Sequence, residues 1–112
     1  HALDGYDEIS LTGGFKLFTK KGEQLIQPED IGQKKIEQSA IFGGNSVADA
    51  AKIFKTILDG KGTDAQNNVV LTNAAFALKV VEGTKSFETC FEEAKEALFS
   101  LKAKACLTKL VQ

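Results

Sequence analysis

Residues 69–81 read VVLTNAAFALKVV, an apolar run interrupted only by Thr72, Asn73 and Lys79. A helix that is apolar on almost every side is stable only in the interior of a protein. An unpaired amide would be costly there, so Asn73 either forms a hydrogen bond across a helix interface or reaches a ligand, and we favour the hydrogen bond. The stretch therefore predicts a buried helix around which the other elements are arranged.

A capped amphipathic helix is predicted before this run. The Ser46 hydroxyl can cap its first backbone amides, with Asp49 three positions later. Gly60 and Gly62 end this helix, and Thr63 can start the next one, which contains the apolar run. Apolar residues at helical spacing form one stripe of the first helix, at Val47, Ala50, Ala51, Phe54, Ile57 and Leu58.

A last helix is predicted from Ser86 onward, as an outer layer over the buried one. Its apolar face consists of Phe87, Cys90, Phe91, Ala94, Ala97, Leu98 and Leu101. Its opposite, solvated face consists of Glu88, Glu92, Glu93, Lys95 and Glu96. Three helices are thus expected in the second half of the chain.

The first quarter of the chain has a strand-like pattern instead. Ile9 and Leu11 alternate with polar residues and predict a short strand, and residues 15–27 predict a hairpin that turns at Lys21-Gly22. Gly22 supplies the positive φ that a tight turn favours. Pro28 opens a single helical turn, and most of the chain after it, up to residue 45, is expected to be loop. The sequence thus predicts a β-like first quarter followed by a helical remainder.

The length and charge of the chain limit the classes of protein to which it can belong. With 112 residues, 43% of them hydrophobic, and a net charge of −1, it can form one domain and has no basic run for nucleic acid. No apolar stretch approaches the roughly 20 residues that cross a membrane, and no secretory signal is visible. All fourteen basic residues are lysine, methionine is absent, and the chain begins at His1. We therefore expect a soluble fragment of a longer protein.

The two cysteines predict no disulfide. Cys90 and Cys106 are placed in the same predicted last helix, where sixteen residues at 1.5 Å each separate them by about 24 Å. Neither belongs to a CxxC pattern. We expect two buried thiols in a reducing cytosol.

The residues with the clearest chemical potential are the carboxylates of Asp4-Gly5-Tyr6-Asp7-Glu8. Hard divalent cations prefer such ligands, and Mg²⁺ commonly takes one or two carboxylates and completes its shell with water and substrate phosphates. Adjacent Asp7 and Glu8 are the candidate metal ligands, although acidic residues near a chain end are more often simply solvated. His1 has no identifiable orienting partner, and no nucleophile with an activating base is visible.

Residues 1–13, HALDGYDEISLTG, resemble the acidic active-site segment of the anthranilate phosphoribosyltransferase family, approximately His-Gly-x-Asp-Gly-x-Asp-Glu-x-Ser. Three further segments follow in the family's order: residues 28–32, the Gly43-Gly44 pair ahead of residues 50–53, and residues 70–78. The resemblance covers essentially all 112 residues.

The resemblance implies that residues 1–112 are an incomplete single domain, the C-terminal part of the large α/β domain of the nucleoside phosphorylase/phosphoribosyltransferase type. The intact enzyme would transfer the phosphoribosyl group of phosphoribosyl pyrophosphate to anthranilate in tryptophan biosynthesis. In the family the Asp-Glu pair matched by Asp7 and Glu8 helps to hold Mg²⁺. The resemblance also implies a cytoplasmic homodimer joined through an N-terminal domain, with this segment inactive alone.

Two departures from the family's pattern are visible. Ala2 stands where glycine is usual beside the histidine, which weakens any role for His1. Leu101 stands in a Ser-Gly-x-Ala turn that often breaks the family's last helix, so we expect this helix to continue to about Leu110. Two other functions stay open from the sequence: a pyrimidine-nucleoside phosphorylase-like enzyme of the same fold, and a non-catalytic helical module that binds a partner protein.

Overall fold

An antiparallel hairpin is the first regular structure of the chain. Strand β1 (Phe15–Thr19) pairs with β2 (Gly22–Ile26), with Thr19 opposite Gly22. The two lysines between the strands make the turn, and Gly22 directly after them has a φ of 122°, a conformation that favours glycine. The predicted hairpin and its positive-φ glycine are confirmed.

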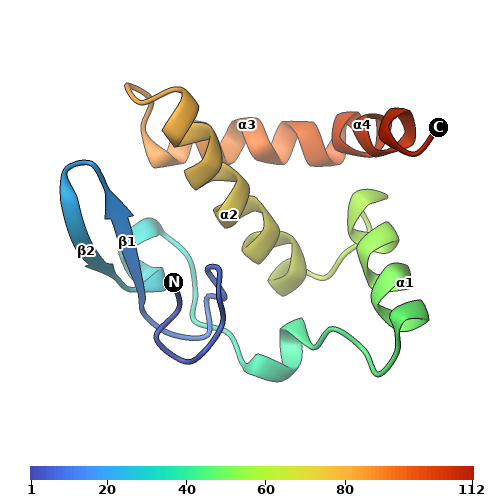
Figure 1. The fold of residues 1–112 in the computed structure, drawn as a ribbon, viewed down its shortest axis with the longest axis horizontal. Helices are drawn as coiled ribbons and strands as arrows, with labels where there is room; N and C mark the ends of the chain where they lie inside the picture. Colours follow the sequence, from blue (N-terminus) through green and yellow to red (C-terminus); the bar gives the residue numbers. More distant parts are fainter. The chain divides into compact units, whose positions relative to one another are not determined.

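The computed structural model describes all of residues 1–112, which divide into two compact units, residues 1–41 and 42–112. In Figure 1 the hairpin of the first unit is blue, and the helices of the second unit run from green to red. The first unit also contains two short 3₁₀ turns, Pro28–Ile31 and Gln38–Ile41, with irregular chain between them. The helical turn at Pro28 and the mostly irregular segment after it were both predicted.

The short strand predicted at Ile9 and Leu11 is wrong. Residues 9–12 are all buried, whereas a half-buried strand would bury every second residue. Leu11 has a left-handed φ of 61°, which no strand residue adopts, and its side chain is only 1% exposed. The partner of β1 on this side is instead the chain start, where Ala2 forms an isolated bridge with Phe15.

The second unit contains helices α1 to α4, which are labelled in Figure 1. They are α1 (Val47–Leu58), α2 (Asp64–Val81), α3 (Phe87–Phe99) and α4 (Lys102–Leu110). The first three begin at the hydroxyl caps that the sequence predicts, because Ser46, Thr63 and Ser86 each accept a hydrogen bond from a backbone amide three residues later. At the end of α1, Gly60 takes a left-handed φ of 72°.

The core of this unit lies between α2 and α3. Leu71 of α2 and Ala94 and Leu98 of α3 form its buried centre. Half-buried apolar side chains pack against that centre, and these are Ile57, Leu58, Ala74, Leu78 and Phe91. The α2–α3 contact is the predicted outer layer on the apolar helix.

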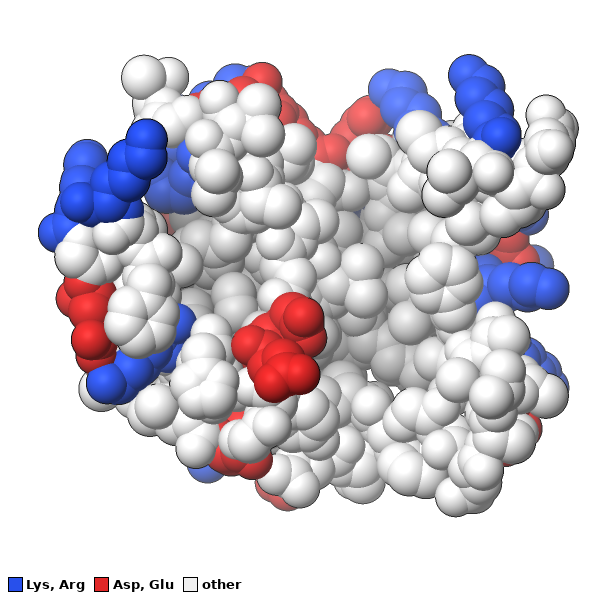
Figure 2. Space-filling view, in the orientation of Figure 1, with Lys and Arg blue, Asp and Glu red and all other residues white.

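The apolar helix is buried along only part of its surface. Leu71, Thr72 and Ala75 are buried, but Val80 and Val81 at its end are 85% and 83% exposed. Likewise α1 has no buried residue, and its predicted apolar stripe contacts the core only through its last two members. Figure 2 shows wide areas of surface that carry neither Lys nor Asp or Glu.

The final helix does not continue unbroken to Leu110, contrary to the prediction. Helix α3 ends at Phe99, and Leu101 takes a left-handed φ of 65° before α4 begins. The Leu101 amide turns back to the Leu98 carbonyl at 3.1 Å, which interrupts the helical hydrogen-bond series. On the far side of the break, Lys104 pairs with Asp59 at 2.6 Å.

The two thiols consequently lie on different helices. Both are free, which agrees with the prediction that they do not pair. Cys90 on α3 is buried, but Cys106 on α4 is exposed, so the expectation of two buried thiols is wrong for Cys106. None of the helices combines the length and the apolar character that a membrane crossing requires.

Candidate functional site

The acidic segment forms a loop whose two ends are tied together by backbone hydrogen bonds. The Leu3 amide donates to the Gly14 carbonyl at 3.0 Å, and the Lys16 amide donates to the His1 carbonyl at 2.8 Å. Residues 4–13 lie between these ties, and Gly5 supplies a φ of 104° near the start of the loop. Its ends are therefore fixed by the strand-like pairing that continues into β1.

Within the loop, three side chains form a continuous series of hydrogen bonds. The Thr12 hydroxyl donates to Oδ2 of Asp4, and the Ser10 Oγ lies 2.7 Å from the Thr12 Oγ1. Because the single hydroxyl proton of Thr12 is used on Asp4, the Ser10 hydroxyl is the donor to Thr12. Ser10 and Thr12 are buried, at 3% and 7% exposure. Asp4 is therefore committed to a structural contact.

The two predicted metal ligands, Asp7 and Glu8, form no structural contact of this kind. Asp7 and Glu8 are both exposed, and neither carboxylate forms an ion pair or hydrogen bond with another residue of the chain. Nowhere in the chain do three or more His, Cys, Asp or Glu side chains gather to hold a metal by themselves. The donor set fits an ion that takes two carboxylate ligands and fills its remaining positions with water and phosphate oxygens, as Mg²⁺ does.

Sequence reasoning missed the role of Ser10 and Thr12 in this loop, because it tested them only as nucleophiles. The available signal was a carboxylate at Asp4 followed by two hydroxyl residues on alternate positions. Of the other candidates, His1 donates from its terminal amine to the Lys16 carbonyl at 3.1 Å. Asn73 donates to the Val69 carbonyl of its own helix at 2.9 Å, and the hydrogen bond expected across a helix interface stays a prediction.

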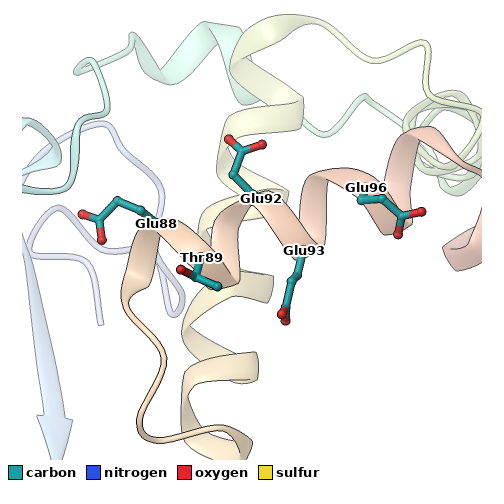
Figure 3. Close-up of a pocket in the computed structure, with 5 residues that line it drawn as sticks. All are labelled: Glu88, Thr89, Glu92, Glu93 and Glu96. Atoms are coloured by element: carbon teal, nitrogen blue, oxygen red, sulfur yellow. The ribbon is translucent and has the colours of Figure 1, made fainter.

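A second acidic surface lies on α3, where five side chains line a shallow hollow: Glu88, Thr89, Glu92, Glu93 and Glu96. Figure 3 shows that these side chains point in different directions from one helix and do not converge. Glu93 pairs with Lys85, and Glu96 pairs with Lys102 at 2.8 Å. The surface is therefore the solvated helix face that the sequence predicts.

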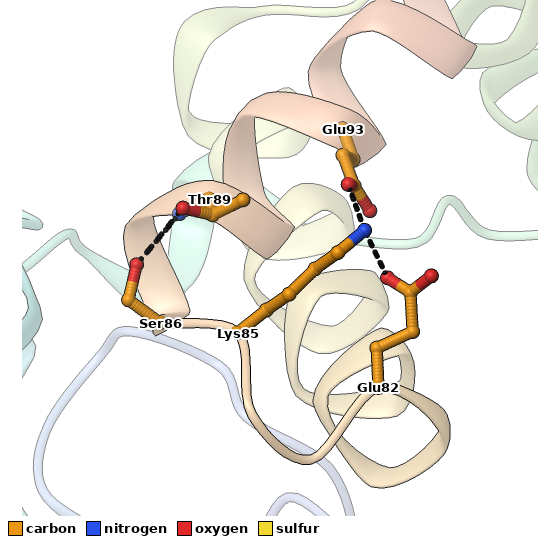
Figure 4. Close-up of polar contacts among 5 residues, drawn as sticks. All are labelled: Glu82, Lys85, Ser86, Thr89 and Glu93. Carbon is orange, nitrogen blue, oxygen red and sulfur yellow. Dashed lines mark hydrogen bonds and ion pairs between the residues drawn. The ribbon is translucent and has the colours of Figure 1, made fainter.

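The connection between α2 and α3 is held by charge (Figure 4). The Lys85 ammonium lies between two carboxylates, 2.7 Å from Oε2 of Glu82 and in contact with Glu93. Lys85 holds the pKa of Glu82 below its ordinary value, and the two carboxylates raise the pKa of Lys85. This cluster joins the two core helices and presents no free ligand.

Comparison with known proteins agrees with the family resemblance of residues 1–13. Residues 1–104 match the family described as glycosyl transferase family, a/b domain. The chain is 46% identical over all 112 residues to the anthranilate phosphoribosyltransferase of Bacteroides fragilis (strain YCH46) and 49% identical to that of Flavobacterium psychrophilum. It spans 34% of the length of each of these relatives.

A solved structure supports the same relationship. The crystal structure of anthranilate phosphoribosyltransferase from Thermus thermophilus superimposes with a TM-score of 0.80 at 26% sequence identity. The superposition covers 95% of this chain and 32% of that one. The predicted α/β fold class is thereby confirmed. With its sequence match running from residue 1 to residue 104, the chain belongs to the glycosyl transferase family, as part of its a/b domain.

Proposed function

We propose that this chain supplies the metal-binding acidic loop of an anthranilate phosphoribosyltransferase. The observation that carries the proposal is the pair of exposed, unpaired carboxylates Asp7 and Glu8, on a loop fixed at both ends. The names of the relatives support the substrate assignment, and they were given to proteins about three times as long as this chain.

In the proposed reaction, the amine nitrogen of anthranilate forms a bond to C1 of the ribose of phosphoribosyl pyrophosphate. The bond from C1 to pyrophosphate breaks, and the amine loses a proton. When bound, a magnesium ion would neutralise the negative charge that develops on the departing pyrophosphate. Asp7 and Glu8 would hold that ion, and none of the 112 residues is assigned to bond making at the ribose.

The surroundings of the two carboxylates favour the binding of a cation. Each is already in water, so binding an ion does not first require an internal ion pair to be broken. Their negative charge attracts the cation, and the tied ends of the loop limit the conformational freedom that binding must remove. The proposal further includes a cytoplasmic homodimer joined by a domain outside these 112 residues.

The test is a substrate assay on the full-length protein that carries this chain. With phosphoribosyl pyrophosphate and Mg²⁺, we expect the fluorescence of anthranilate to fall, with one pyrophosphate released for each anthranilate consumed. Omission of phosphoribosyl pyrophosphate or chelation of Mg²⁺ should stop both changes. Phosphorolysis of pyrimidine nucleosides without consumption of anthranilate would reverse the assignment in favour of a nucleoside phosphorylase. Neither activity, together with stable binding of a partner protein, would favour an interaction module.

A further inference from the structure

The hydrogen-bonded series Ser10–Thr12–Asp4 lies across the loop that carries the two free carboxylates. Asp4 and Thr12 are eight positions apart, and their contact closes the loop from one arm to the other. Asp7 lies three residues after Asp4, and Glu8 lies four residues before Thr12. The contact therefore shortens the flexible span that contains the proposed metal ligands.

We propose that Thr12, which accepts a hydrogen bond from Ser10 and donates one to Asp4, positions Asp7 and Glu8 for the metal ion. We assign these three as positioning residues, which act on the metal ion through the conformation of the loop. The inference rests on the proposed function of Asp7 and Glu8, and it assigns different roles to the three carboxylates of one short segment.

Burial makes this contact a durable one. The hydroxyls of Ser10 and Thr12 are withdrawn from water, so breaking either hydrogen bond leaves a buried polar group without a partner. The Thr12 amide also lies 3.4 Å from the Ser10 Oγ, which holds the two hydroxyl residues in one tight turn. The carboxylate of Asp4 is thus drawn toward the buried arm, while Asp7 and Glu8 stay in solvent.

The backbone between the two hydroxyls shows the same constraint. Leu11 has a left-handed φ of 61°, a conformation that is unfavourable for a residue with a Cβ. Its carbonyl accepts a hydrogen bond from the Ile36 amide at 2.9 Å, and its side chain is 1% exposed. Strained residues persist where their surroundings fix them, and they are concentrated at functional sites. Residues 10–12 are therefore fixed by three hydrogen bonds: from Thr12 to Asp4, from Ser10 to Thr12, and from the Ile36 amide to the Leu11 carbonyl.

The consequence is a loop that is organised before the ion arrives. Ligands held by well-ordered supporting residues lose less freedom on binding, and loss of such support commonly weakens a metal site by about 10-fold or more. Removing the Thr12 hydroxyl should lengthen the flexible span and lower metal affinity, although Thr12 itself is no ligand.

The experiment measures Mn²⁺ binding to the full-length protein by electron paramagnetic resonance, with Mn²⁺ as the probe for Mg²⁺. Thr12→Val keeps the shape of the side chain and removes the hydroxyl, and we expect about 10-fold weaker Mn²⁺ binding. Thr12→Ser restores the hydroxyl and should bind as the parent does. Thr108→Val is the matched control, because that exposed threonine bonds only to the Lys104 carbonyl of its own helix.

Ser10→Ala is the second variant. It removes the hydroxyl that donates to Thr12 but leaves the Thr12–Asp4 contact, and it should weaken Mn²⁺ binding by about 3-fold, less than Thr12→Val does. Circular dichroism establishes that each variant is folded. Parental Mn²⁺ affinity in folded Ser10→Ala and Thr12→Val would overturn the positioning role. An Asp7→Asn/Glu8→Gln variant is measured in parallel: if it too binds Mn²⁺ normally, the proposed metal site itself is wrong, and the two failures are thereby distinguished.

Discussion

Leu101 occupies a conformation that favours glycine over any residue with a Cβ. Its φ of 65° and ψ of 15° place it in the left-handed region, which costs an ordinary residue about 1–2 kcal/mol. The residue is 43% exposed, so only part of its side chain gains from burial. The break between α3 and α4 is thus maintained in spite of its residue type.

At residue 101, glycine should stabilise the fold more than alanine does, which is the reverse of their order inside a helix. Leu101→Gly and Leu101→Ala both remove the side chain, but only glycine relieves the left-handed strain. We expect the free energy of unfolding of the glycine variant to exceed that of the alanine variant by about 1 kcal/mol, and urea denaturation measures this difference. In a continuous helix the order reverses, because alanine is favoured over glycine by about 1 kcal/mol. A more stable alanine variant would therefore contradict the observed break.

At the scale of single residues, the sequence shows which side chains can bind or bond, but not which contacts each one forms in the fold. Asp7 and Glu8 were predicted as metal ligands, and that role stays a prediction; the structure shows both side chains exposed and without a partner. The residue types of Asp4 and Thr12 signal that they can form a hydrogen bond, but the contact itself spans eight residues and depends on the path of the loop, which the sequence does not give. The Leu101 conformation was also missed, since an apolar residue in an apolar pattern favours helix continuation.

At the scale of elements, the α2–α3 connection depends on charge. Lys85 bridges Glu82 and Glu93, and its backbone carbonyl accepts a hydrogen bond from the Lys79 ammonium at 3.1 Å. The pKa of Glu82 lies below its ordinary value of 4.5 in the folded chain. This carboxylate therefore stabilises the fold above pH 4.5, and its contribution is lost as the pH falls through the lowered folded-state pKa.

The pH dependence of a Lys85→Met variant tests that connection. We expect it to unfold more easily than the parent near neutral pH, because two carboxylates lose their shared cation. Below about pH 4 the difference should shrink, since protonated Glu82 no longer gains from Lys85. Urea denaturation across this range is the measurement, with Lys95→Met on α3 as the control. A Lys85→Met deficit that stays constant down to about pH 2 would show that charge is not its source.

The boundaries of elements were predicted where a local signal sets them. Ser46, Thr63 and Ser86 mark helix starts, because a hydroxyl cap acts within three residues of itself. The hairpin follows in the same way from its turn glycine. The strand expected at Ile9 failed for the opposite reason: residues 9–12 are all buried and Leu11 has a left-handed φ, and no alternation of residue types records either feature.

At the scale of the whole molecule, several apolar side chains have no cover within the 112 residues. Val47 and Phe54 of α1 and Val80 and Val81 of α2 are all more than half exposed. The sequence predicted an apolar stripe on the first helix and a buried helix over residues 69–81. A sequence pattern specifies which side of a helix is apolar but not which segment covers it. The relatives are about three times as long as this chain.

The central claim is that Asp7 and Glu8 hold the ion on which turnover depends. Its most direct test is the Mg²⁺ dependence of turnover in a full-length Asp7→Asn/Glu8→Gln variant. A matched control neutralises two other exposed carboxylates that form no ion pair, as Glu88→Gln/Glu92→Gln. Because neither Asp7 nor Glu8 contacts another side chain through hydrogen bonds or charge, stability should change by less than about 0.5 kcal/mol.

We predict that the Mg²⁺ concentration for half-maximal turnover rises at least about 10-fold in the Asp7→Asn/Glu8→Gln variant and is unchanged in the control. An Asp7→Asn/Glu8→Gln variant that turns over with the parent's Mg²⁺ dependence would contradict the account, and the acidic loop would then be a solvated surface segment of its family's fold.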